Sequence, residues 1–285
     1  MLDGRPLIDV HLHPAHRAGL KVPWDVWLQD FDRAEVDDLY DGDRVVAERF
    51  DALLEREGVD VAVVLAEYSP RVTGTQAVED MAALVGPRVR FAANVNPHVH
   101  FPVDEELVRQ LDLGAVALKV HPVHGGFAVD DRALYPAYAI CQERGLPVVV
   151  HCGTSTFPGA LNRYGDPVLL DNVLRDFRRL QIVLAHGGRG WWYDAAAFLA
   201  LSNPNVWIEL SGLPPSRLPT YYARHNWNRL SRRMIFGTDW PGIPGIAANA
   251  RAVAALLPDD ATRDLVLAGN ASQVYRLDLP SGTIS

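Results

Sequence analysis

The chain has 285 residues, of which 48% are hydrophobic and 22% charged, and a formal net charge of −8, which is ordinary for a globular protein with a large core. The acidic balance without a basic cluster argues against nucleic-acid binding, and having only two cysteines, Cys141 and Cys152, argues against a disulfide-stapled secreted scaffold. The longest apolar run, 61–66, is too short to span a bilayer and the N-terminus has no signal pattern, so we expect a cytoplasmic protein that binds neither nucleic acid nor membrane.

Short apolar, β-branched segments recur along the chain, with helical stretches between them. Their uninterrupted hydrophobicity is typical of strands that are covered on both faces or closed into a barrel. We expect eight strands, at Pro6–Val10, Val59–Ala66, Val89–Asn94, Ala115–Val120, Pro147–Val150, Gln181–Ala185, Val206–Leu210 and Met234–Gly237.

Eight strand–helix units in about 250 residues match the size of a (β/α)8 TIM barrel. We therefore predict an α/β protein with one such barrel as a single domain over 1–285. The alternative is a doubly wound open sheet, which usually carries a phosphate-binding glycine loop after its first strand. This chain has histidines at that place, which favours the barrel.

The connections add detail to this picture. The apolar spacing in 44–57 and 131–144 predicts two helices, and Gly145 provides a helix-ending signal for the second. The first connection, 14–43, is unusually long and aromatic; it is either a lid over the barrel mouth or a small insertion on its rim. The tail 280–285 is predicted to be flexible.

A histidine pair ends the first predicted strand. Residues two apart in a strand point to the same face, so His11 and His13 should aim together into the barrel mouth. Two converging imidazoles suit a borderline metal such as Zn²⁺. Alone, a pair with this spacing is weak evidence for a metal site.

Three further polar residues come directly after apolar strands. His151 follows strand five, His186 follows strand six, and Asp239 follows strand eight. Active-site residues of a (β/α)8 barrel lie at these carboxyl ends. Packing does not explain polar side chains at all of these positions together, so the sequence predicts a metal-dependent site.

This order of motifs resembles the amidohydrolase superfamily, and within it the amidohydrolase-related family that includes aminocarboxymuconate-semialdehyde decarboxylase. The resemblance implies that His11, His13, His151 and Asp239 hold one divalent metal, most plausibly zinc, with Mn²⁺ or Fe²⁺ as alternatives. It also implies that His186 and Asp239 are catalytic, His186 as an acid or base beside the metal. The segments that carry it are spread over the chain: 8–13, 118–122, 146–153, 185–190 and 236–241.

Lys119 and His121 are also two residues apart, at the end of the fourth strand. In some members of the superfamily a lysine at this place is carbamylated and bridges two metals. The competing interpretation is an ordinary lysine paired with a carboxylate, with His121 contacting the substrate. Because the chain resembles the mononuclear branch more closely, we favour one metal.

Arg189 and Trp191 follow His186 closely and are predicted to bind the substrate. A guanidinium beside an aromatic ring can bind a carboxylate and stack on a planar molecule. Arg189 could instead point outward and pair with Asp194. Ser211 lacks a nucleophile-elbow motif and is interpreted as structural, and Cys152 is expected to point away from His151.

These residues lead to three functional hypotheses. The first is a hydrolase that uses a metal-activated water on an amide, lactone or related bond of a small, carboxylate-bearing molecule. The second keeps the site but catalyses non-oxidative decarboxylation of an aromatic or muconate-type acid. The third is a metal-binding barrel without catalysis. Whether the chain forms a homodimer is left open by the sequence.

Overall fold

The computed structural model describes residues 1–21, 36–243 and 245–279. Its centre is a sheet of eight strands in the order β1-β4-β7-β8-β9-β10-β11-β12, all paired in parallel. The strands are β1 (Ile8–Leu12), β4 (Val61–Leu65), β7 (Val89–Asn94), β8 (Leu118–Val120), β9 (Val148–Gly153), β10 (Ile182–Arg189), β11 (Val206–Glu209) and β12 (Met234–Ile235). All eight predicted strands are confirmed.

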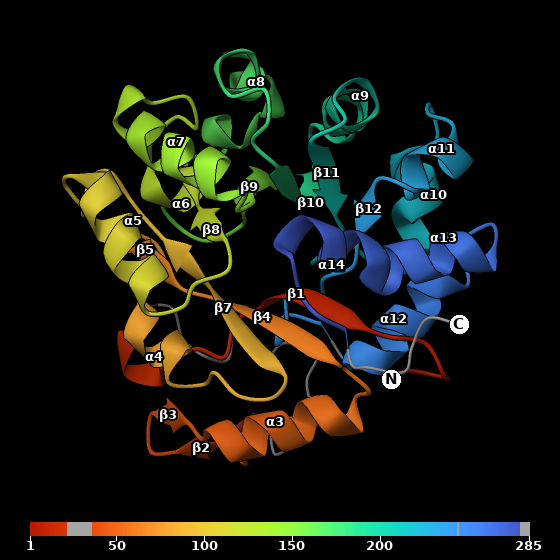
Figure 1. The fold of residues 1–285 in the computed structure, drawn as a ribbon, viewed down its shortest axis with the longest axis horizontal. Helices are drawn as coiled ribbons and strands as arrows, with labels where there is room; N and C mark the ends of the chain where they lie inside the picture. Colours follow the sequence, from red (N-terminus) through yellow and green to blue (C-terminus); the bar gives the residue numbers. More distant parts are fainter. Residues whose placement is uncertain (22–35, 244, 280–285) are drawn as a thin grey trace.

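Helices surround this sheet on its outer face (Figure 1). The α-helices are α3 (Ala47–Arg56), α4 (Val78–Ala82), α5 (Val103–Asp112), α6 (Pro122–Gly125), α7 (Tyr135–Arg144), α8 (Asp171–Asp176), α9 (Tyr193–Ser202), α10 (Leu218–Tyr221), α11 (Trp227–Ser231), α12 (Ile246–Ala254), α13 (Asp260–Asp264) and α14 (Asn270–Tyr275). Two small antiparallel hairpins pair β2 (Tyr40–Asp41) with β3 (Arg44–Val45) and β5 (Glu67–Ser69) with β6 (Gly74–Gln76).

The backbone closes the sheet into a nearly complete barrel between β1 and the segment after β12. Leu12 forms a parallel bridge with Trp240, and the amide of Asp239 donates to the carbonyl of His11 at 2.9 Å. The amide of His13 donates to the carbonyl of Trp240 at 2.7 Å. The predicted (β/α)8 architecture is therefore confirmed.

Apolar side chains form two layers, one inside the barrel and one between the strands and the surrounding helices. Alternate strand residues such as Val10, Val63 and Val183 pack inside the barrel together with Tyr275 of α14. The other strand residues, such as Leu12, pack outward against the surrounding helices. Because each strand is buried on both faces, its sequence is a continuous apolar run. The inner apolar layer supports the polar residues that follow at the carboxyl ends.

One predicted helix begins later than expected. The helix predicted over 44–57 begins later, at Ala47, because Arg44 and Val45 pair with Tyr40 and Asp41 in the β2–β3 hairpin. Most of the predicted lid or rim insertion lies in 22–35, outside the described residues, as does the tail 280–285. None of the helices in the described part of the chain is long and apolar enough to cross a membrane.

The seam between β1 and β12 depends on one buried carboxylate. Asp9 accepts hydrogen bonds from the amide of His11 (3.1 Å), the amide of Thr238 (3.1 Å) and the hydroxyl of Thr238 (2.6 Å). Asp9→Ala should lower the free energy of unfolding by about 2–4 kcal/mol, because it leaves buried donors without an acceptor. Urea unfolding followed by circular dichroism measures this loss.

The matched control is Asp112→Ala at the exposed end of α5, which should change the stability by no more than about 0.5 kcal/mol. If Asp9→Ala is as stable as this control, the carboxylate does not hold the seam.

Candidate active site

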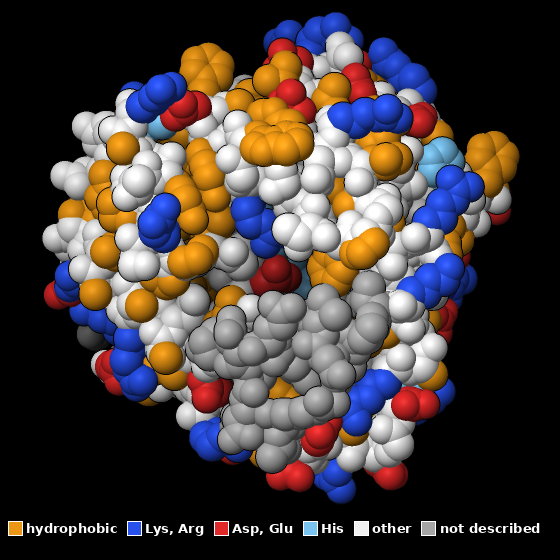
Figure 2. Space-filling view, turned by 180° about the vertical axis from the view of Figure 1, so that it is seen from behind, with side chains coloured by type: hydrophobic (Ala, Val, Ile, Leu, Met, Phe, Trp, Pro, Cys, Tyr) orange, Lys and Arg blue, Asp and Glu red, His pale blue; other side chains and the backbone are white. Residues whose placement is uncertain are grey.

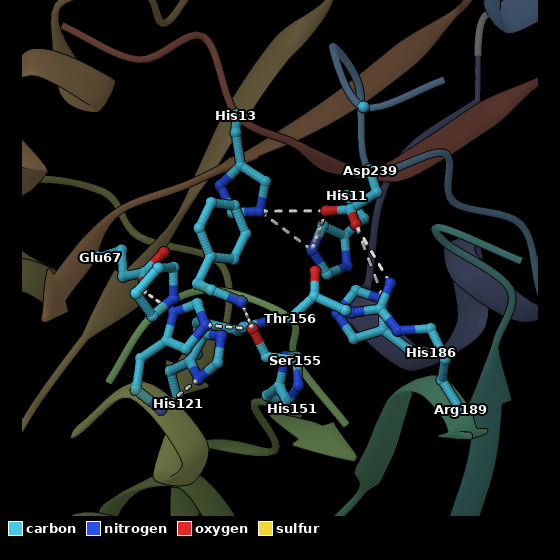
Figure 3. Close-up of a pocket in the computed structure, with 15 residues that line it drawn as sticks. His11, His13, Glu67, His121, His151, Ser155, Thr156, His186, Arg189 and Asp239 are labelled. Carbon is cyan, nitrogen blue, oxygen red and sulfur yellow. Dashed lines mark hydrogen bonds and ion pairs between the residues drawn. The ribbon is translucent and has the colours of Figure 1, made fainter. Parts of the chain in front are cut away.

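The carboxyl ends of the strands enclose a cavity of about 290 Å³. With the exception of Trp191, all of the sequence-predicted site residues line it: His11, His13, Lys119, His121, His151, His186, Arg189 and Asp239. Figure 3 shows them converging from several strands. The cavity also contains residues that the sequence analysis did not single out: Glu67, His124 and Ser155.

Three of these side chains come together at the seam. The Nε2 atoms of His11 and His13 lie 3.1 Å apart. Oδ1 of Asp239 lies 3.3 Å from Nε2 of His11 and 3.4 Å from Nε2 of His13. The expectation from strand alternation, that the two imidazoles aim at the same point, is confirmed. One potential ligand atom from each residue lies within 4.8 Å of the other two.

The backbone at the site adopts an unfavourable conformation at two residues. His186 has a φ of 66° and Asp239 a φ of 70°, in the left-handed region that non-glycine residues rarely occupy. Such strain concentrates at functional sites. Gly212 faces the same two residues, and a Cβ there would lie 2.8 Å from Oδ2 of Asp239 and 2.6 Å from Nη1 of Arg189. A glycine is therefore needed for these side chains to approach.

A buried carboxylate missed by the sequence analysis orients His11. Oε2 of Glu209 lies 2.7 Å from Nδ1 of His11 and accepts from the hydroxyl of Ser211 at 2.8 Å. With Nδ1–H donated to Glu209, Nε2 of His11 presents its lone pair to Asp239. A carboxylate in this position fixes the tautomer of a metal-binding histidine. Glu209 ends an apolar strand, which is the signal that identified His151.

Ser211 also positions His186, so it belongs to the site. Nδ1 of His186 lies 3.0 Å from the carbonyl of Ser211 and 2.9 Å from its hydroxyl. Since the carbonyl can only accept, Nδ1 carries the proton, and Nε2 is the ring nitrogen available for chemistry. The interpretation of Ser211 as structural was therefore incomplete, because it contacts two of the predicted functional histidines.

Burial controls the protonation of the cavity residues. It holds the pKa values of four histidines well below the usual 6.5: His11, His121, His151 and His186. Burial alone would raise the pKa of Asp239, but His186 and His13 beside it hold that pKa well below its usual range. The site thus offers neutral imidazoles and an ionised carboxylate, the forms that bind metals.

Lys119 is a buried cation that lines the cavity. Only 2% of its surface is exposed, and burial lowers its pKa to about 8, against the opposing pull of Glu209 and Asp239. Burial raises the pKa of Glu209 to about 7. A lysine with a pKa near neutrality can exchange protons at physiological pH. It also has the neutral fraction that carbamylation would require.

The donor atoms of His11, His13 and Asp239 are close enough together to hold a divalent metal, whereas His151 is not part of this close group. Both ring nitrogens of His151 are buried and have no hydrogen-bond partner among the described residues. Its ring lies 4.6 Å from that of His186. The lone pair of His11 faces an anionic oxygen of Asp239, which a cation between them would stabilise. Three imidazoles and one carboxylate are ligands typical of zinc and of related divalent metals.

The predicted substrate-binding residues differ in their positions. Nη1 of Arg189 lies 3.8 Å from Oδ2 of Asp239, so Arg189 faces the cavity. Asp194, the alternative partner, pairs instead with Arg224 at 2.9 Å. The structure does not bring Trp191 into the cavity: its indole is 69% exposed and lines a separate surface hollow with Tyr193. A contact between Trp191 and the substrate stays a prediction.

Space-filling representation shows the mouth of the barrel as a hollow with acidic and basic side chains at its centre and apolar side chains around it (Figure 2). Active sites of (β/α)8 enzymes lie at the carboxyl ends of the strands, which is where this cavity lies. The fold and the site therefore define a (β/α)8 barrel enzyme.

The chain belongs to the amidohydrolase family, whose sequence model matches residues 8–277. This confirms the resemblance inferred from the motifs. Sequence comparison with curated proteins finds no match.

Solved structures with the same fold include a TIM-barrel protein from Bordetella bronchiseptica, which is 22% identical with a TM-score of 0.76 over 95% of this chain and 98% of its own. Two decarboxylases are also similar. Dihydroxybenzoic acid decarboxylase from Polaromonas sp. JS666, solved with bound manganese, is 17% identical with a TM-score of 0.67 over 96% and 97% of the two chains. 5-Carboxyvanillate decarboxylase from Sphingomonas paucimobilis is 17% identical, with a TM-score of 0.64 over 96% of this chain and 99% of its own.

The buried histidines predict a loss of stability in acid. Because the four histidines with lowered pKa values stay neutral in the folded state, the unfolded chain binds more protons below about pH 6.5. Asp9 and Glu209 act in the opposite direction, since burial raises the pKa of each to about 7. The four histidines outweigh the two carboxyl groups, so the free energy of unfolding should fall as the pH drops from about 6.5 to 5.5. The fall is roughly 1.4 kcal/mol per pH unit for each proton that the unfolded chain binds in excess of the folded chain.

Urea unfolding at constant ionic strength across this pH range provides the measurement. A stability that stays constant or rises towards pH 5.5 would contradict the neutral state of the histidines.

Proposed function

We propose that the chain is a metal-dependent, non-oxidative decarboxylase of a small aromatic or unsaturated carboxylic acid. The observation that carries the proposal is the meeting of a three-histidine, one-carboxylate donor set with two cations, Lys119 and Arg189, in one cavity of about 290 Å³. This cavity suits a small anion. The decarboxylases with the same fold favour this reaction over the hydrolysis that the sequence alone suggested.

The metal is proposed to be held by His11, His13, His151 and Asp239. When bound, it would supply a positive charge that orients the acid and stabilises negative charge formed during the reaction. We favour one metal per chain, with zinc as the prediction from the ligand set and manganese as the alternative. A carbamate on Lys119 that bridges two metals stays the competing hypothesis.

The chain's own residues have three tasks in decarboxylation. Arg189 can hold a carboxylate through two parallel hydrogen bonds, which fixes the orientation of the acid. When the C–C bond breaks and CO2 leaves, the ring carbon keeps the electron pair and must gain a proton. Lys119, with a pKa of about 8, carries a proton at neutral pH and can donate it at the cavity wall.

His186 and Asp239 are the proposed proton acceptors of the site. His186 is neutral and has Nε2 available, because Ser211 holds its Nδ1. Asp239 is ionised and lies 3.9 Å from Nδ1 of His186. In the resting site these two groups can take up a proton from the substrate, for example from a phenol, and return it before the next cycle.

Hydrolysis of an amide, lactone or related bond is the second candidate. The observation that favours it is the same pair of proton acceptors, Asp239 and His186, which could deprotonate an attacking water. Both candidates use a small-molecule substrate, and the reaction product separates them. A metal-binding barrel without turnover is the third hypothesis, a cytoplasmic location stays a prediction, and the sequence leaves a homodimeric state open.

The metal prediction concerns stoichiometry. The purified protein should contain about one divalent transition metal per chain by elemental analysis. His11→Ala should lose the metal, since a ligand contributes directly to affinity. His186→Ala should keep most of it and lose turnover by about 100-fold or more, because an acid or base acts mainly in the transition state.

His98→Ala is the matched control: the side chain is exposed and lies outside the cavity, so both metal and turnover should be unchanged. Two metals per chain with a carbamate on Lys119 would overturn the mononuclear assignment. Equal loss of metal from His186→Ala and His11→Ala would make His186 a ligand.

The reaction itself is tested with aromatic acids and their esters. We expect CO2 release from a dihydroxybenzoate or a carboxyvanillate. Arg189→Ala should lower kcat/KM by about 10- to 100-fold, because a charged hydrogen bond contributes about 1.5–3 kcal/mol. Arg189→Lys should recover only part of this loss, since lysine keeps the positive charge but cannot donate the two parallel hydrogen bonds of a guanidinium.

Arg224→Ala removes an exposed guanidinium outside the cavity and should leave kcat/KM unchanged. Release of an alcohol from the esters that is lost together with the metal in His11→Ala, without CO2 from the acids, would favour the hydrolase. If both Arg189 variants act on the acid as the parent does, Arg189 does not hold the carboxylate.

A further inference from the structure

Three buried side chains that line the cavity form a hydrogen-bonded chain, and Figure 3 shows one of them, Glu67, on the side away from Asp239. Nδ1 of His124, on α6, lies 2.7 Å from Oε1 of Glu67, on β5. Nε2 of His124 lies 2.8 Å from Oγ of Ser155, in the loop after β9. An acid, an imidazole and a hydroxyl in this order match the roles of a nucleophilic triad, which is recognised by geometry and not by position in the sequence.

Glu67 and Ser155, at the two ends of this triad, are each held in place by further contacts. Glu67 is 5% exposed and also accepts from the hydroxyl of Thr73 at 2.7 Å. The amide of Ser155 donates to Asn162 at 2.8 Å, and the amide of Phe157 donates to the hydroxyl of Ser155 at 3.3 Å. Glu67 can only accept when ionised, so Nδ1 of His124 carries the proton and Nε2 accepts from the serine.

Glu67 is in its ionised form despite its burial. Desolvation would raise the pKa of this carboxyl, but His121 and His124 beside it hold the pKa well below its usual range. A carboxylate that stays charged can stabilise an imidazolium on its neighbour. This is the part that the third member of a triad plays when the histidine takes up the proton of the serine.

A second metal site is the competing interpretation, because Glu67, His121 and His124 have potential ligand atoms within 4.8 Å of one another. The ring arrangement argues against it. His121 and His124 are stacked, with centroids 3.7 Å apart and planes inclined by 13°. Lone pairs of parallel rings run side by side and do not converge on one ion. Both nitrogens of His124 also already have partners.

We propose that Ser155 is a nucleophile, activated by His124 and oriented through Glu67, that transfers the acyl group of small esters without using the metal. Oγ of Ser155 forms a bond to the acyl carbon while its proton passes to Nε2 of His124. The bond to the leaving alkoxide then breaks, and His124 returns the proton to it. Water releases the acyl group in a second step, with His124 as the base.

The surroundings define the kind of ester. The triad opens into a cavity of about 290 Å³, so only small acyl groups fit. Lys119 and Arg189 line the same cavity, and their charges favour an anionic tetrahedral intermediate and an acid-bearing ester. This activity goes beyond the proposed decarboxylation and does not depend on it, because its nucleophile, base and orienting carboxylate are not the residues assigned to decarboxylation.

The test uses a small fluorophosphonate on the protein as purified. Oγ of the nucleophile should displace fluoride from phosphorus, giving one adduct per chain by intact mass and placing it on Ser155 by peptide mapping. Ser155→Ala should abolish the adduct. His124→Gln should slow labelling by about 100-fold or more, and Glu67→Gln by about 10-fold or more, since they weaken general-base activation.

Ser231→Ala, a buried serine outside the cavity, should label at the parental rate. No adduct on the parent protein, or an adduct on another residue, would overturn the proposal whatever the variants do. Elemental analysis adds a second arm: His124→Gln should keep the full metal content. Loss of a metal equivalent from this variant would mean that the cluster is a metal site.

Discussion

The hydrogen bonds between β1 and the segment after β12 are the constraint on which the site depends. They close the barrel, and they also hold His11 and Asp239 beside each other, because the amide of Asp239 donates to the carbonyl of His11. Asp9 stabilises this seam by accepting hydrogen bonds from the amide and the hydroxyl of Thr238. The strained backbone of Asp239 is held by neighbours on both sides, so its carboxylate meets the two imidazoles without having to be ordered at each turnover.

A second theme is the density of ionisable groups in a buried cavity. Lys119, Glu67, Glu209 and Asp239 would each be costly to bury alone. They are tolerated together because each has an opposite charge or a hydrogen-bonding imidazole close by. His11, His13 and Asp239 meet in one part of the cavity, and the hydrogen-bonded Glu67–His124–Ser155 chain lines the same cavity.

The eight strands and most of the cavity could be predicted from the sequence, since a polar residue directly after an apolar strand lies at the barrel mouth. Glu67 and Glu209 obey the same rule, and applying it to every strand would have found them. The contact of His124 with Ser155 could not be predicted, because it depends on how the short helix α6 and the loop after β9 fold. The same is true of Trp191: it is close to His186 in sequence, yet the turn at Gly190, with a φ of 88°, precedes an exposed position.

We propose that the closed seam creates one metal site. Anomalous X-ray scattering from crystals grown with zinc or manganese tests it most directly. One strong peak is expected, within about 2.5 Å of the donor atoms of His11, His13, His151 and Asp239. A peak between Glu67 and His124, two peaks bridged by Lys119, or no peak near the seam would contradict it.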